Sequence, residues 1–212
     1  MAQKNLFTIF MDALFDRENN GTINGYYGEH LVQRELNLVK LFGRKGEILR
    51  NIYIPKEDGE TTEVDVVFIT VKGIFVIESK NYSGWIFGDE KAYKWTAMLP
   101  NKIKNKFYNP IKQNDLHIEH LRKYLDMDIP LFSIIVFSER CELKKIKLER
   151  NDVFVIKRDS LYSTIRKIWK TAKDSLSENE VDEIYNKLKK LTNVDKSVAL
   201  EHIENIKKKI DV

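Results

Sequence analysis

The chain lacks the features that define several protein classes. It has a single cysteine, Cys141, in 212 residues, which excludes an internal disulfide framework and is typical of a reducing compartment. No apolar run approaches the roughly 20 residues that a membrane-spanning helix needs, and the opening MAQKNLFTIFMDALF has no signal-peptide cleavage pattern. No glycine-rich loop ends in Gly-Lys-Ser or Gly-Lys-Thr, so nothing predicts nucleotide triphosphate use. We expect a cytoplasmic protein with no membrane contact.

The composition fits a soluble globular chain that folds without disulfides or structural metals. Charged residues make up 32% of the sequence and the apolar set 42%. The net charge of +4 is mild, so it permits a nucleic-acid partner without predicting one.

Hydrophobic periodicity predicts alternating helices and strands. Apolar residues recur at helical spacing in residues 6–14, 26–42, 111–125, 161–169 and 181–191. Short runs rich in Val, Ile and Phe predict strands at 47–54, in both halves of 63–80, and at 84–87, 92–99, 131–137 and 153–156. The last two runs are continuously apolar, as in strands covered on both faces. We therefore expect an α/β fold with a mixed sheet flanked by helices.

Three regions follow from these patterns: an N-terminal helical segment (1–24), a main domain (25–172) and a C-terminal helical extension (173–212). In the extension, Ser177 and Glu180 have capping-box spacing, and Asp195 can cap a last helix. This predicted helical pair could dock on the main domain or on a partner, so a homo-oligomer or a partner protein bound through it stays open.

The stretch EVDVVFITVKGIFVIESK, residues 63–80, places charged side chains in two apolar strands. If the hairpin turns between Val71 and Lys72, Asp65 lies opposite Glu78, with side-chain bases about 5 Å apart. Lys80 points to the same side as Glu78 because strand side chains alternate. A three-residue loop with a bulge would shift this register.

Two carboxylates so close repel each other unless a cation or proton intervenes. A hard divalent ion, Mg²⁺ or Mn²⁺, resolves the conflict because it prefers oxygen ligands, and it supports phosphodiester hydrolysis with Lys80 beside the attacking water. The alternative is that Asp65 and Glu78 end their strands in water and form a surface ion pair with Lys80. The pattern of an Asp followed by Glu-x-Lys does not decide between these readings.

A series of ordered motifs occurs between about Gly25 and Trp169: Gly28-Glu29, Glu63-Val-Asp65, Phe75-Val-Ile-Glu78-Ser-Lys80-Asn, Gly84-Trp-Ile, Trp95 and Asn109-Pro-Ile-Lys-Gln113. This series resembles the nuclease-related domain (NERD) family of the PD-(D/E)xK nuclease superfamily. The resemblance implies a restriction-endonuclease-like core. The superfamily name places a proline directly before the aspartate, and this chain has Val64 at that position. The difference removes no ligand.

The resemblance also implies roles for the residues of these motifs. Asp65 and Glu78 correspond to metal ligands, the carbonyl of Ser79 to a further ligand, and Lys80 to the catalytic lysine. Glu29 corresponds to the acid that completes the site at the metal or its water shell. The alternative for Glu29 is an acid favoured by the dipole at a helix start.

Gln113 corresponds to a glutamine that orients Lys80 or contacts the substrate; a plain helix-surface glutamine is the alternative. Just before it lies a basic segment that includes Phe107 and Tyr108. Cations can neutralise phosphates and exposed rings can stack on unpaired bases, so this segment is a candidate nucleic-acid contact, with a solvated loop as the alternative. Its basic residues are Lys102, Lys104, Lys106 and Lys112.

His117 and His120 lie three residues apart on a predicted helix, which raises the possibility of a zinc site. Other Cys or His residues at ligand spacing are missing, so we expect both to be ordinary helix residues facing solvent.

These patterns predict a nuclease that depends on Mg²⁺ or Mn²⁺ and hydrolyses phosphodiester bonds in DNA, with RNA left open. The alternative is a catalytically inert nucleic-acid-binding or assembly module that keeps the nuclease fold. The complete set of Asp65, Glu78 and Lys80 favours the enzyme.

Overall fold

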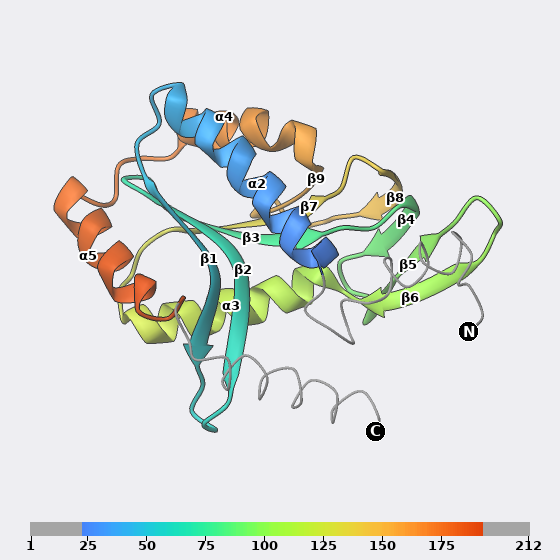
Figure 1. Cartoon of the computed structure of the whole chain (residues 1–212), viewed down its shortest axis with the longest axis horizontal. Coiled ribbons are helices and arrows are strands. Elements are labelled where there is room, and N and C mark those ends of the chain that lie inside the picture. Colours follow the sequence, from blue (N-terminus) through green and yellow to red (C-terminus); the bar gives the residue numbers. More distant parts are fainter. Residues whose placement is uncertain (1–22, 193–212) are drawn as a thin grey trace.

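In a computed structural model of the chain, residues 23–192 are described, and they form two β-sheets with four α-helices (Figure 1). The helices predicted at residues 6–14 and from Asp195 onward lie outside the described residues. The elements in chain order are α2 (Ile23–Leu41), β1 (Glu47–Pro55), β2 (Thr61–Thr70), β3 (Gly73–Lys80), β4 (Gly84–Asp89), β5 (Lys94–Met98), β6 (Lys104–Tyr108), α3 (Pro110–Leu125), β7 (Leu131–Phe137), β8 (Cys141–Lys147), β9 (Val153–Lys157), the 3-10 turn η1 (Arg158–Ser160), α4 (Leu161–Thr171) and α5 (Glu178–Lys189).

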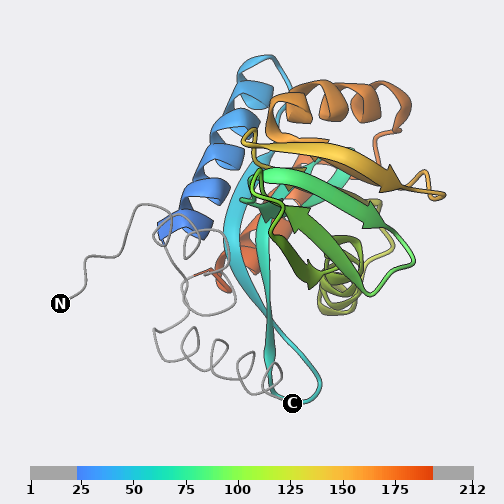
Figure 2. The same ribbon diagram turned by 90° about the vertical axis from the view of Figure 1, so that its right-hand side faces the viewer.

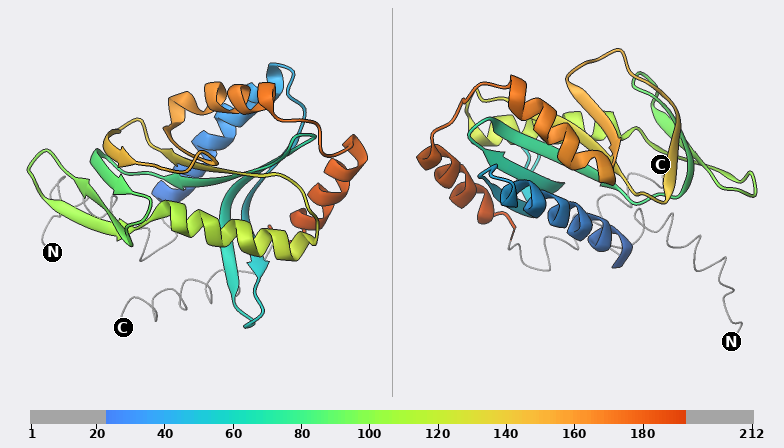
Figure 3. Two further views of the ribbon diagram at one scale, coloured as in Figure 1. Left: turned by 180° about the vertical axis from the view of Figure 1, so that it is seen from behind. Right: turned by 90° about the horizontal axis from the view of Figure 1, so that it is seen from above.

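The larger sheet has five strands in the order β1-β2-β3-β7-β9. The first three are antiparallel neighbours, whereas β3, β7 and β9 run parallel. Helices α2 and α4 cover one face of this sheet, and α3 and α5 cover the other (Figures 1 and 3). The predicted mixed sheet with helices on both sides is confirmed.

Strand β3 is buried along its whole length, and its side chains alternate between two cores. Ile74 and Val76 pack with residues of α3 and α5, whereas Phe75 and Ile77 pack with residues of α2 and α4. Each such side chain contributes about 1.5–3 kcal/mol on burial. This double burial holds the end of β3 in a fixed position.

The hairpin from β2 to β3 has the predicted register. Its pairs run from Thr70↔Gly73 to Val66↔Ile77, so the turn contains only Val71 and Lys72. Gly73 has φ of 122°, and a Cβ at this position would lie 2.3 Å from the Pro130 carbonyl oxygen. Glycine is therefore required where the hairpin meets the loop before β7.

A second sheet of four strands, in the order β6-β5-β4-β8, lies beside the first (Figure 2). Strands at the positions of β4 and β5 were predicted from the sequence, but β6 and β8 were not. Their sequences, KNKFY and CELKKIK, contain too many lysines to form an apolar run. A core that includes Trp95, Phe107 and Phe137 fills the space between the two sheets.

Helices α2 and α5 differ in how well their buried side chains match the apolar residues predicted at helical spacing. On α2, Leu38 and Leu41 are exposed although both belong to the apolar residues that recur at helical spacing in residues 26–42, whereas Leu36 is buried. On α5, Ser177 and Glu180 form the predicted capping box, and Val181 and its neighbours on the stripe pack against the sheet. None of the helices within residues 23–192 is long and apolar enough to cross a membrane.

Candidate active site

Asp65 lies where β2 and β3 stop pairing. The last backbone pair of the hairpin is Val66↔Ile77, and beyond it the backbone N–H of Ser79 donates a hydrogen bond to Asp65 Oδ2 at 2.8 Å. The carboxylate thus replaces a backbone carbonyl as the acceptor. This bond fixes the buried Asp65 side chain against β3, next to Glu78, as the hairpin register predicts.

Glu78 and Lys80 form a buried ion pair at the end of β3. Lys80 Nζ lies 2.8 Å from Glu78 Oε1, and the exposed fractions are 0% for Glu78 and 7% for Lys80. The alternative of a solvated surface bridge is therefore wrong. Taking two charges out of water costs several kcal/mol per ion, which the fold tolerates only with good geometry and further hydrogen bonds.

Gln113 supplies one of those hydrogen bonds from α3. Lys80 Nζ donates to Gln113 Oε1 at 2.8 Å, so the predicted contact between the two residues is present. Gln113 is half-buried, and the alternative of a plain surface glutamine is wrong. Its role in a reaction remains a prediction.

Asn109 sets the position of α3 and hence of Gln113. Its side-chain oxygen accepts the N–H of Ile111, which caps the helix, and Pro110 occupies the first helical position. Its Nδ2 group lies 2.7–3.2 Å from the carbonyl oxygens of Asp89, Glu90 and Ala92 in the β4–β5 turn. The Asn-Pro motif therefore fastens the start of α3 to the second sheet.

His117 belongs to the site, although the sequence reading placed it in solvent. Its ring is 6% exposed, with Nε2 3.4 Å from Glu78 Oε2 and Nδ1 2.8 Å from Thr62 Oγ1. His117 follows Gln113 by one helical turn, so both face the end of β3. That spacing was the signal that could have identified it. His120 is half-buried on the same helix.

Glu29 lies on α2, beside the end of β3. A Cβ at the preceding Gly28 would lie 3.2 Å from Ser79 Oγ and 3.4 Å from Asn81 Cβ, so the glycine allows the helix to approach this closely. Glu29 is buried. Because α2 begins at Ile23, Glu29 is not in its first turn, and the explanation by the helix dipole is wrong.

The oxygen donors at this strand end have the chemistry of a magnesium or manganese site. Asp65 and Glu78 offer two buried carboxylates on adjoining strands, and the Ser79 carbonyl directly follows Glu78 in the sequence. Within residues 23–192, no three His, Cys, Asp or Glu side chains are grouped as a ready-made metal cage. Mg²⁺ needs no such cage, since it usually binds through one or two carboxylates and keeps several waters. The residues fit such an ion.

The predicted basic segment is divided between three elements. Lys104 and Lys106 are exposed on β6, Lys102 lies in the turn before it, and Lys112 is half-buried on α3. Phe107 is buried and stacks on Tyr82, with ring centroids 4.3 Å apart. The expectation that the Phe107 ring is available to unpaired bases is therefore wrong.

Arg140 is an exposed cation near the site that the sequence reading missed. Ser138 N donates to the Lys80 carbonyl at 3.0 Å, and Arg140 Nη2 donates to Asn81 Oδ1 at 2.9 Å. Strands β3 and β7 are parallel, and their carboxyl ends meet at one edge of the sheet. The Ser-Glu-Arg sequence directly after an apolar strand was the available signal.

Comparison with known proteins supports the resemblance found in the sequence. The family model of the nuclease-related domain matches residues 24–138, which include α2, both strands of the hairpin, α3 and β7. An uncharacterized protein of Bacillus anthracis is 33% identical over 186 residues, covering 87% of this chain and 84% of that protein. No solved structure matches the chain.

Proposed function

Since the chain belongs to the nuclease-related domain family, we propose that it is a divalent-metal-dependent nuclease that hydrolyses phosphodiester bonds in DNA. One observation carries the proposal: a buried lysine at the end of β3 is held by Glu78 and Gln113, with Asp65 fixed alongside. A protein keeps two buried carboxylates and a buried ammonium at one strand end only at considerable cost. A catalytic role at this position would explain why the fold keeps these charged groups buried.

Lys80 is the group that acts on the reacting phosphate. Its ammonium is fixed by two oxygen acceptors, so little reorganisation is needed to stabilise negative charge that develops on phosphate oxygens. Lys80 can also orient the attacking water through a remaining N–H. Gln113 and His117 act through their contacts with Lys80 and Glu78 and are positioning residues.

Asp65, Glu78 and the Ser79 carbonyl would hold Mg²⁺ or Mn²⁺, and Glu29 would complete the site directly or through water. When bound, the ion supplies Lewis-acid polarisation of the phosphodiester and a more acidic water. The chain contributes fixed oxygen donors, a buried site that excludes bulk water, and the Lys80 cation.

The test is cleavage of single-stranded, duplex and branched DNA, and of RNA, with Mg²⁺ or Mn²⁺. We expect wild-type protein to cut DNA, and Glu78→Gln and Lys80→Gln to lose at least about 100-fold of the rate. Lys167→Gln, which removes an exposed charge on α4, is the control and should cut as wild type. Activity that survives in both site variants would point to another site or a contaminant.

The alternative is a nucleic-acid-binding module without cleavage activity, and one observation favours it. Both Glu78 oxygens already face groups of the protein, the Lys80 ammonium and the His117 ring, so the carboxylate has polar partners without a metal. DNA binding without cutting, together with no Mn²⁺ uptake by calorimetry, would support this reading. Assembly through α5 is less favoured because its apolar side chains cover the chain's own sheet.

A further inference from the structure

The four-stranded sheet has an outer face that belongs to none of the buried clusters within residues 23–192. Its inner face is defined by Ile86, Trp95, Ala97 and Phe107, which pack into the core between the two sheets. Side chains on a strand alternate, so the residues between these point outward. Trp85, next to Ile86, is 42% exposed.

Strand register sorts the outward residues into rows across the sheet. One row contains Lys104, Met98, Trp85 and Glu142, and the next contains Lys106, Thr96, Phe87 and Lys145. Beyond them Lys94 pairs with Tyr108. Residues paired across strands lie on the same face, so these side chains form one continuous surface. We refer to Trp85, Phe87, Lys94, Lys104, Lys106 and Lys145 as the lysine-aromatic face.

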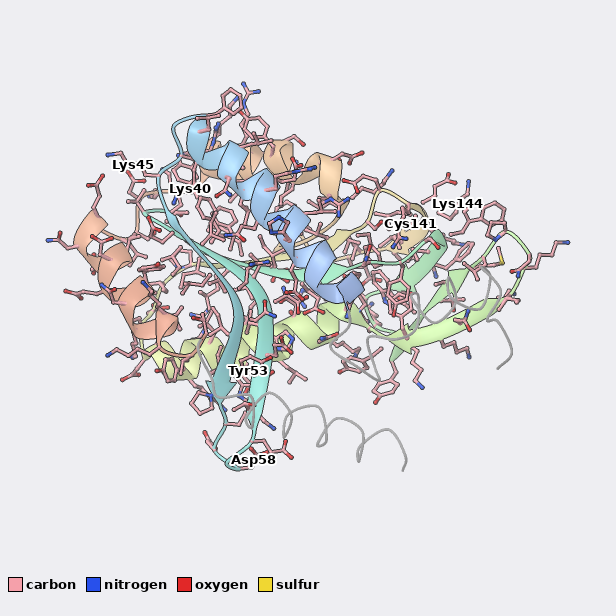
Figure 4. All side chains as sticks on the ribbon, viewed as in Figure 1. Lys40, Lys45, Tyr53, Asp58, Cys141 and Lys144 are labelled. Carbon is pink, nitrogen blue, oxygen red and sulfur yellow. The ribbon has the colours of Figure 1, made fainter. Side chains whose placement is uncertain are left out.

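The lysine-aromatic face is positively charged. Glu142 is paired with Lys144, whose Nζ lies 2.6 Å from its carboxylate and 5.3 Å from the centre of the Trp85 ring. Lys144 is labelled in Figure 4, near Cys141 at the start of β8. Among the described residues, the four lysines of the lysine-aromatic face have no ion-pair partner. A cationic surface that exposes an indole ring is complementary to phosphates and to the flat faces of bases.

We propose that the lysine-aromatic face binds single-stranded DNA, with a base stacked on Trp85 and phosphates on Lys104 and Lys106, and delivers that strand to the site at the end of β3. The choice of DNA rests on the proposed function. A single strand is favoured over a duplex because an exposed ring on a sheet can stack only on bases that are not paired. The sheet that carries this face is connected to the site by short segments: β4 begins at Gly84, shortly after Lys80, and β8 begins directly after Arg140.

Tryptophan fluorescence tests the stacking contact directly. The chain has three tryptophans, of which Trp95 is buried and Trp169 half-buried. We expect a dT20 oligonucleotide, added in EDTA so that nothing is cut, to quench the emission of wild-type protein. Trp85→Phe should remove the quenching yet bind within about threefold of wild type, because phenylalanine can still stack. Trp85→Ala should bind at least about tenfold more weakly.

The lysines are tested by the salt dependence of binding. Lys104→Gln with Lys106→Gln should weaken dT20 binding and reduce the slope of log K against log salt by about 1.4, since each phosphate contact contributes about 0.7 for single strands. The matched control is Lys167→Gln with Lys170→Gln, which removes two exposed charges from α4 and should leave both quantities unchanged. Circular dichroism establishes that each variant is folded.

The inference is overturned if the Trp85→Ala and double-lysine variants bind dT20 as wild type does. It is also overturned if duplex DNA or a U20 RNA binds more tightly than dT20. Because binding is measured without metal, the result is separate from cleavage. Binding through the lysine-aromatic face with no cleavage would support this inference and contradict the proposed nuclease activity. Cleavage without such binding would support the nuclease activity and contradict this inference.

Discussion

The ring of His117 joins Glu78 to Thr62. Its Nε2 lies 3.4 Å from Glu78 Oε2, and its Nδ1 lies 2.8 Å from the Thr62 hydroxyl. One helix side chain thus contacts both strands of the hairpin and sets the orientation of the Glu78 carboxylate. Polar partners that orient a metal-ligating side chain are needed almost as much as the ligand itself.

His117→Ala should lower the proposed metal-dependent DNA cleavage about 10- to 100-fold, because Glu78 loses the contact that orients it. His120→Ala on the same helix is the control and should stay close to wild type. Cleavage rates should be measured beside urea unfolding curves, so that lost activity is separated from lost stability. Equal rates for the two histidine variants would show that His117 does not position Glu78.

Asn109→Ala should destabilise the protein by about 2–4 kcal/mol, because it removes a helix cap and the amide that donates to the carbonyls of Glu90 and Ala92 in the β4–β5 turn. The exposed Asn101 accepts a single hydrogen bond from Ile103 N, and Asn101→Ala should cost less than about 0.5 kcal/mol. Urea unfolding measures both. A small loss for Asn109→Ala would mean that α3 is held in place by its apolar contacts alone.

Cys141 should be unreactive in the folded protein. Burial raises the pKa of its thiol to about 11 from 9.0, and Sγ donates a hydrogen bond to the Ser138 carbonyl. Because the thiolate is the reactive form, its fraction at pH 8 is about 100-fold smaller than in the unfolded chain. A thiol reagent should therefore label the native protein at least that much more slowly than protein in urea. Rapid labelling of native protein would show that the β8 end of the core opens.

The capping box of α5 should make stability depend on acid pH. Hydrogen bonds from the Ser177 backbone N–H, then from its hydroxyl, lower the pKa of Glu180 below its ordinary value of 4.5. A carboxyl whose pKa is lower in the folded state stabilises fully above pH 4.5, and this contribution is lost as the pH falls through the folded value. Glu180→Ala should therefore lower Tm at pH 7, with a difference from wild type that shrinks below pH 4.

Glu183→Ala, on the exposed side of the same helix, controls for the change in charge and helix propensity. It should alter Tm by less than Glu180→Ala at pH 7. A Glu180→Ala deficit that stays constant down to pH 3 would rule out the ionised carboxylate as its source.

The hairpin could be predicted from the sequence because side-chain alternation fixes its register once the turn is centred between Val71 and Lys72; a three-residue loop was the alternative, and the structure excludes it. That register places Asp65 across from Glu78 and puts Lys80 on the same side as Glu78, and the resemblance to a nuclease family added the contact with Gln113. The features of the hairpin depend on local pattern and short-range pairing and were predicted for that reason, whereas the Gln113 contact was predicted from the resemblance alone.

The remaining features depend on contacts between distant segments. The second sheet needs β8 to pair in parallel with β4 across more than fifty residues, and its lysine-rich sequence gives no apolar signal. The burial of His117 depends on where α3 rests against the hairpin, and the exposure of Leu38 and Leu41 depends on where α2 extends past the sheet. None of these positions is fixed by periodicity.

The strand order of the smaller sheet leaves β6 and β8 as its outermost members. An open strand edge offers backbone hydrogen bonds to any other extended chain and is a route to fibrils. These strands carry two and three lysines, respectively, so two copies brought edge to edge would repel each other. The lysines therefore protect the edges of the smaller sheet against aggregation. A polyanion that neutralised most of these lysines would weaken that protection.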